Sequence, residues 1–227
     1  SKEVQQVRSF EAKILAKYRK FLKRCQIVAH QQKKNVDLRS CAIYCLTDCL
    51  LSFPHFNHHR ECVKICLEIL VDCNKPAEKG FQDLIMTSFQ KLFEKDKEYE
   101  STKDVFQIIQ QVMARKKGHS AINTLFQLLG KLKLKIVTSE EAGGTASGED
   151  IEIKKRLKQA DIQMDKEKAA KNQAKIVDES CLFYMKTCMR LLYPSKDTHS
   201  SQKNTPMLAS VFEAIPGVLP LLTYDHI

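Results

Sequence analysis

The first thirty residues carry apolar side chains at intervals of three and four, and this spacing constrains the fold more than any other feature. The positions are Val7, Phe10, Ile14, Tyr18, Phe21 and Cys25. An α-helix places residues with this spacing on one face, so a long helix is predicted over about residues 3–30. The same period predicts further helices over 37–53, 57–73, from Pro76 through Phe93, from Ser101 or Thr102 to Lys117, and over 120–135.

Capping residues predict where these helices begin and end. Asp37, Asn57 and either Ser101 or Thr102 are predicted N-caps, because their side chains can accept a backbone N–H of the first turn. Pro54 and Gly118 mark predicted ends. Residues 131–136 alternate apolar and basic, which is compatible with a short strand or with a frayed helix end.

The predicted helices fall into pairs. Residues 37–73 and 76–117 each form an antiparallel hairpin of about 40 residues, the length of a two-helix repeat. Only 7 Gly and 6 Pro occur in 227 residues, which disfavours a turn-rich all-β protein. The predicted fold class is all-α, an irregular α-solenoid of HEAT-like helix pairs with a long charged helix. An irregular helical bundle is the alternative.

Three parts are predicted along the chain. Residues 1–136 form a helical-repeat domain that begins with a basic helix, and the small, Gly-rich segment 137–148 is a flexible linker. Residues 149–227 comprise a charged, solvent-exposed spacer helix up to Lys175, a new apolar stripe up to Tyr193, a polar loop, and two short helical pieces. These last apolar helices are predicted to pack back on the repeat.

Positive charge is concentrated at the start of the chain. The net charge is +10, and residues 1–39 hold eleven basic and three acidic residues. Such a segment favours an anionic partner, most often nucleic acid, although a solvated helix face has the same composition. The candidate nucleic-acid-binding residues are Lys13, Lys17, Lys20, Arg24, Arg115, Lys116 and Lys117. Their contacts would be mainly to phosphate, which RNA and DNA share.

Nine cysteines, an odd number within helical patterns, indicate a reducing compartment such as the cytosol or nucleus rather than a disulfide framework. No segment is long and apolar enough to span a membrane, so no membrane association is expected. The chain begins with Ser1 rather than Met, and we expect it to be a fragment of a longer protein.

One cluster has the residue types of a metal site. It comprises Cys41, Cys45, Cys49, His55, His58, His59, Cys62 and Cys66. Thiolates and imidazoles bind zinc, but the cluster has no C-x-x-C pair and its cysteines lie among Leu and Ile. Buried thiols are therefore the favoured interpretation, with no metal or cofactor. The sequence also contains no H-E-x-x-H, G-x-S-x-G or paired-carboxylate motif, so we expect no enzymatic activity; a metalloenzyme using this cluster is the opposing hypothesis.

The run Ala42–Asn57, which ends in Pro54-His55-Phe56-Asn57, resembles the nucleolar complex protein 3 family, where a Leu-rich helix ends in the same four residues. Other stretches resemble the family in the same order: Tyr18–Leu22, Leu92–Lys97, the helix ending at Arg115–Lys117, Leu132–Ile136 and Ala174–Leu192. The four motif residues are interpreted as structural. The resemblance covers most of the chain and implies a helical-repeat build.

The resemblance also implies a function. The family works in the nucleolus and nucleus on assembly and export of large ribosomal subunit precursors, and it pairs with nucleolar complex protein 2. The leading hypothesis is therefore a non-enzymatic pre-60S assembly factor that binds pre-rRNA, a nucleolar complex protein 2 homologue and other assembly factors. The alternative is a replication-licensing factor that bridges origin proteins and chromatin, a role that the family has also been given.

Overall fold

The computed structural model describes residues 2–31, 35–73, 75–115, 119–132, 149–192 and 205–215, and side chains in slightly narrower ranges. Within these ranges the chain is helical and contains no strand, which confirms the all-α class. The helices are α1 (Lys2–Gln31), α2 (Val36–Ser52), α3 (His59–Asp72), α4 (Lys79–Lys95), α5 (Glu100–Arg115), α6 (His119–Leu129), α7 (Glu149–Leu192) and α8 (Thr205–Ala214), with a 3₁₀ turn, η1 (Pro76–Glu78). The predicted linker 137–148 and most of the loop before α8 lie outside the described residues.

The chain divides into two compact units. The first comprises residues 1–92 and 107–125, and the second comprises residues 93–106 and 126–227. Because the boundaries fall inside α4, α5 and α6, both units contain residues of these three helices. Each unit is described by itself below.

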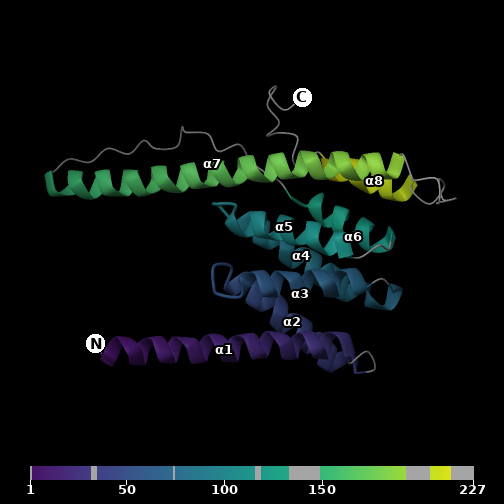
Figure 1. The fold of residues 1–227 in the computed structure, drawn as a ribbon, viewed down its shortest axis with the longest axis horizontal. Helices are drawn as coiled ribbons and strands as arrows, with labels where there is room; N and C mark the ends of the chain where they lie inside the picture. Colours follow the sequence, from purple (N-terminus) through teal and green to yellow (C-terminus); the bar gives the residue numbers. More distant parts are fainter. Residues whose placement is uncertain are drawn as a thin grey trace. The chain divides into compact units, whose positions relative to one another are not determined.

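In the first unit, α1 packs against α2 and α3 (Figure 1). Two side-chain contacts join α1 to α3: Arg19 Nε lies 3.1 Å from Glu61 Oε2, and Gln26 Nε2 lies 3.2 Å from Glu68 Oε2. The second contact is seven residues further along both helices, so α1 and α3 run in the same direction. The core between the helices contains fully buried leucines of three elements, Leu22, Leu46, Leu50, Leu67 and Leu70.

Three predicted N-caps were wrong, each by a few residues. Asn35, not Asp37, caps α2, where its Oδ1 accepts the Leu38 N–H at 3.0 Å. His58, not Asn57, precedes α3; its φ of 70° is left-handed and its side chain makes no capping hydrogen bond. Helix α5 begins at Glu100, before both predicted caps. The Asp96 carboxylate accepts the Thr102 N–H at 2.7 Å, so the cap comes from the preceding loop.

Two further boundaries differ from the prediction. Helix α6 ends at Leu129, not near Lys135, because Gly130 and Lys131 form a turn in which the Leu132 N–H bonds the Leu129 carbonyl. Residues 133–136, most of the candidate strand 131–136, lie outside the described residues. In the second unit α7 is one continuous helix of 44 residues, through both the charged segment and the apolar stripe that follows it.

The second unit has an aromatic core. The Phe183 ring on α7 lies 6.0 Å from Phe106 and 5.7 Å from Phe126, and Phe126 lies 5.7 Å from Tyr184, measured between ring centroids. Part of the predicted spacer contributes to this unit's packing, since Ala169, Asn172 and Gln173 are buried. The charged segment of α7 is therefore not a purely solvated helix, because its residues near Asn172 pack against protein.

Candidate functional site

One basic residue near the start of the chain is buried and serves packing. Arg39 on α2 donates through Nε to the Ala29 carbonyl at 2.9 Å and forms an ion pair with Glu78. Its guanidinium also lies 3.5 Å from the Cys73 sulfur and 5.1 Å from the centre of the Phe81 ring. Arg39 therefore ties α1, α2 and α4 together and does not contribute to a basic surface.

The Cys/His cluster does not form a metal site among the described residues, where no three His, Cys, Asp or Glu side chains are placed to share an ion. Cys62 and Cys66 are buried in the core, Cys41 is exposed, and His55 is exposed in the loop before α3. The fold thus places these thiol and imidazole side chains in different surroundings, some in the core and some at the surface. The eight cysteines whose side chains are described are free thiols.

The fold raises the pKa of several thiols. A hydrogen bond with Cys66, together with burial, raises the pKa of Cys62, and the Cys62 sulfur also lies 3.5 Å from the Leu46 carbonyl. Burial raises the pKa of Cys25 to about 11, and burial likewise raises the pKa of Cys49 and of Tyr18 beside it. A neutral thiol is a poor nucleophile and a poor metal ligand, so these groups act as small apolar side chains.

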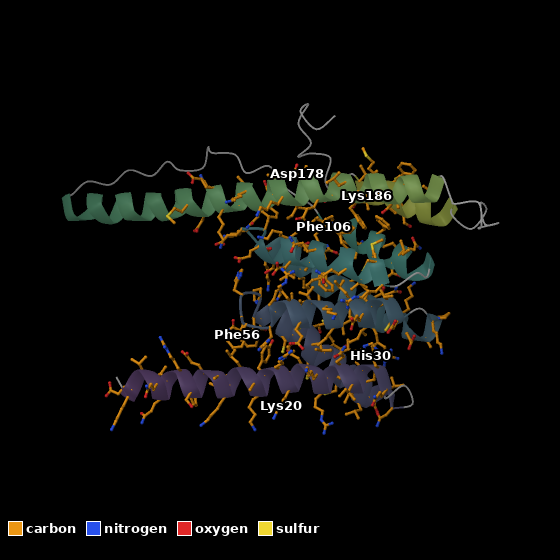
Figure 2. All side chains as sticks on the ribbon, viewed as in Figure 1. Lys20, His30, Phe56, Phe106, Asp178 and Lys186 are labelled. Atoms are coloured by element: carbon orange, nitrogen blue, oxygen red, sulfur yellow. The ribbon has the colours of Figure 1, made fainter. Side chains whose placement is uncertain are left out.

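The Pro54-His55-Phe56-Asn57 motif forms the turn between α2 and α3. The Phe56 N–H donates to the Phe53 carbonyl and the His59 N–H donates to the Phe56 carbonyl, at 3.1 and 3.0 Å. The Phe56 ring, labelled in Figure 2, meets the Tyr18 ring of α1 edge-on. The two ring centroids are 5.3 Å apart. This turn therefore contacts α1, although both Phe53 and Phe56 remain partly exposed.

The candidate nucleic-acid-binding residues fall into two groups. Lys13, Lys17, Lys20 and Arg24 are exposed along α1, and Figure 2 labels Lys20 on this helix. Arg115 is exposed at the end of α5, while Lys116 and Lys117 lie outside the described residues. Among the described residues, the basic surface is thus mainly on α1.

The sequence analysis identified the apolar stripe of the same helix but missed its exposure to solvent. Val7, Phe10, Ile14 and Phe21 expose 55, 64, 44 and 42% of their surface. The buried side chains of α1 are Leu22, Cys25 and Ala29, all in its second half. A length comparison could have revealed this overhang, because the predicted first helix is much longer than the 17 and 14 residues of α2 and α3 against which it packs.

These observations describe an all-helical, basic protein whose first helix carries both lysines and apolar side chains into solvent. No helix among the described residues combines the length and apolarity needed to cross a membrane.

No family model matches the chain. The chain is similar to the nucleolar complex protein 3 homolog of Mus musculus, with 25% identity over 121 residues. The match covers 48% of this chain and 14% of the mouse protein, so it concerns a small part of that relative.

Proposed function

We propose that this chain is part of a non-enzymatic scaffold that helps to assemble large ribosomal subunit precursors in the nucleolus. The observation that carries the proposal is the similarity to the mouse nucleolar complex protein 3 homolog over 121 residues. The all-helical fold and the basic first helix fit such a role, since a scaffold needs surface rather than a catalytic centre. The proposed partners are pre-rRNA, a nucleolar complex protein 2 homologue and other assembly factors.

The proposed scaffold is a HEAT-like array of helix pairs. In the first unit, the partners of the contacts Arg19–Glu61, Gln26–Glu68 and Gln82–Thr124 are each separated by 42 residues. A two-helix repeat of about 40 residues produces this offset, because equivalent helices of successive repeats lie side by side in parallel. The shared offset supports a repeating arrangement over an irregular bundle.

Pre-rRNA is proposed to contact exposed basic side chains. Lys20 and Arg24 on α1 and Arg115 on α5 are exposed, and phosphate contacts from such residues are independent of base sequence. Removal of one such residue should lower the slope of log affinity against log salt concentration by about one. The replication-licensing alternative relies on the same contacts to phosphate. Only an experiment can therefore distinguish it from the ribosomal proposal.

The test is an affinity purification of the tagged full-length protein with and without RNase, read by RNA sequencing and mass spectrometry. The expected result is large-subunit precursor rRNA with a stoichiometric nucleolar complex protein 2 homologue. The variant Lys20→Glu/Arg24→Glu should recover less pre-rRNA, whereas Lys171→Glu/Lys175→Glu on exposed positions of α7 is the matched control. Origin proteins that survive RNase, with no pre-rRNA, would overturn the proposal and favour replication licensing.

A further inference from the structure

The exposed apolar stripe of α1 lies along two open depressions. The first is lined by Lys2, Gln5, Gln6, Ser9, Phe10 and Lys13. The second is lined by Lys13, Ile14, Lys17, Tyr18 and Phe21. Lys13 borders both depressions, which are together called the groove below. In Figure 1 the N-terminal half of α1 extends past α2 and α3, the helices on which its second half packs.

The apolar side chains of the groove have the spacing of a helix-packing surface. Phe10, Ile14 and Phe21 follow one another at intervals of four and seven residues, as anchors do when one helix lies along another. Single exposed apolar residues are ordinary, but a row of this length on one helix face marks a surface that a partner buries. Proteins bind RNA through phosphate contacts and base stacking, and the aliphatic side chain of Ile14 serves neither.

The charges around the groove define the chemistry of its occupant. Lys13 and Lys17 line it directly, and Lys2 borders its first part. Over residues 2–24 the helix has eight basic and two acidic residues. A second copy of this chain would bring the same positive charge to the contact, which disfavours self-association. Carboxylates on the occupant would instead match these lysines and set its register.

We propose that this face of α1 binds an amphipathic helix of another protein, whose apolar ridge is flanked by Asp and Glu. The ridge packs on Phe10, Ile14 and Phe21, and the flanking carboxylates pair with Lys13 and Lys17. The assignment goes beyond the proposed function and does not depend on it, because it follows from the exposure and charge of α1 alone. In this assignment Lys13 and Lys17 contact a protein partner, whereas Lys20 and Arg24 contact nucleic acid.

The first experiment maps what covers the groove. The photoreactive residue benzoylphenylalanine replaces Phe10 or Ile14 in the full-length protein in cells, and Phe212, which is exposed on α8, is the control position. After irradiation, mass spectrometry identifies the crosslinked segment. The expected result is one segment of another protein at both α1 positions, with apolar residues at helical spacing beside Asp and Glu. Crosslinks to RNA, to a second copy, to another part of this chain, or to nothing would overturn the proposal.

The second experiment tests the charge pairing with the mapped segment as a synthetic peptide. Binding to the 227-residue chain is measured by fluorescence anisotropy. Lys13→Glu/Lys17→Glu should weaken binding about tenfold or more, because two attractive pairs become repulsive. Lys171→Glu/Lys175→Glu should leave binding unchanged. Replacing the peptide's facing acidic residues by Lys should restore binding to the Lys13→Glu/Lys17→Glu variant, and failure of this rescue would overturn the proposed pairing.

A third variant separates this inference from the ribosomal proposal. Phe10→Ser/Ile14→Ser removes the apolar anchors from exposed positions, so the fold should persist, as circular dichroism would check. The variant should lose the peptide while the full-length protein keeps its pre-rRNA. Retention of the peptide would overturn the docking site, whereas absence of pre-rRNA from the unmodified protein would overturn only the proposed function.

Discussion

Arg39 and Glu78 form an ion pair that is almost entirely removed from water, with 7 and 11% of their side-chain surfaces exposed. They are 39 residues apart and join α2 to the turn η1. The guanidinium also donates through Nε to the Ala29 carbonyl and through Nη2 to the Cys73 sulfur. A buried charge of this kind depends on its partner, and among the described residues Glu78 is the acidic side chain that pairs with Arg39.

Glu78→Ala is expected to lower the free energy of unfolding by about 3–5 kcal/mol, because it leaves the Arg39 charge buried without its counter-charge. Urea denaturation followed by circular dichroism measures the change. Glu11→Ala, at an exposed position of α1, should change stability by less than about 0.5 kcal/mol. The double variant Arg39→Met/Glu78→Leu should recover most of the stability, since it removes both charges. Equal effects of Glu78→Ala and Glu11→Ala would contradict this description.

The edge-on contact between Tyr18 and Phe56 couples α1 to the turn after α2. A double-mutant cycle with Tyr18→Leu and Phe56→Leu should give a coupling energy of about 0.5–1.5 kcal/mol, the usual range for paired aromatic rings. His55→Leu in the same turn is the control, because His55 is exposed. Its coupling with Tyr18→Leu should be near zero. Additive effects at positions 18 and 56 would mean that the ring contact contributes nothing to stability.

Alkylation should distinguish the thiols by exposure. With iodoacetamide at about pH 7.5, Cys41 should react at least about ten times faster than Cys62 and Cys66, because Cys62 and Cys66 are buried and the pKa of Cys62 is also raised. Peptide mass spectrometry of timed samples gives the rate at each position. In urea the rates should converge. Rapid labelling of Cys62 in the folded protein would show that the reagent reaches the core around this thiol.

Stability should fall as the pH rises from about 9 to about 11. The pKa of Cys25 is about 9 in the unfolded chain and about 11 in the folded protein, so its stabilising contribution is present below pH 9 and disappears between these values. Each such group contributes a slope of about 1.4 kcal/mol per pH unit. Urea midpoints at about pH 8, 9.5 and 11 measure the trend. Cys25→Ala should show a shallower slope; an unchanged slope would exclude Cys25 as a source.

In the second unit, Phe183→Ala is expected to cost roughly 3 kcal/mol, because the ring contacts Phe106, Phe126 and Tyr184. Leu182→Ala, at an exposed position beside it, should cost less than about 0.5 kcal/mol. Thermal unfolding monitored by circular dichroism compares the two variants with the unmodified protein. Comparable melting temperatures for both would argue against an aromatic core around Phe183.

Local sequence patterns predicted the helices well, because helical periodicity is a property of neighbouring residues. The first helix was expected at about 3–30 and occupies 2–31, and the second was expected at 37–53 and occupies 36–52. Caps were less predictable, since Asn35 and Asp37 offer similar side-chain oxygens two residues apart. Helix α5 takes its capping contact from Asp96, outside the helix altogether.

Features that depend on distant residues could not be predicted. Nothing near Arg39 indicates that it is buried, because its counter-charge, Glu78, lies 39 residues away. The candidate metal cluster was defined by spacing alone, whereas the folded helices send Cys41 to the surface and Cys62 to the core. The basic and apolar residues of α1 were both recognised, but their joint exposure follows from the shortness of the neighbouring helices.

The uneven burial of α1 has a consequence for the entropy of association. All its buried side chains lie at or after Leu22, and Tyr18 and Arg19 contact Phe56 and Glu61, so the turns before Tyr18 are held helical mainly by their own backbone hydrogen bonds. Amide hydrogens there should exchange faster than those near Ala29. A partner must then suppress this fraying when it binds, and part of its interaction energy is used to order the helix. Affinity would therefore depend on intrinsic helix propensity at positions such as Ala12 and Ala16 as well as on the groove itself.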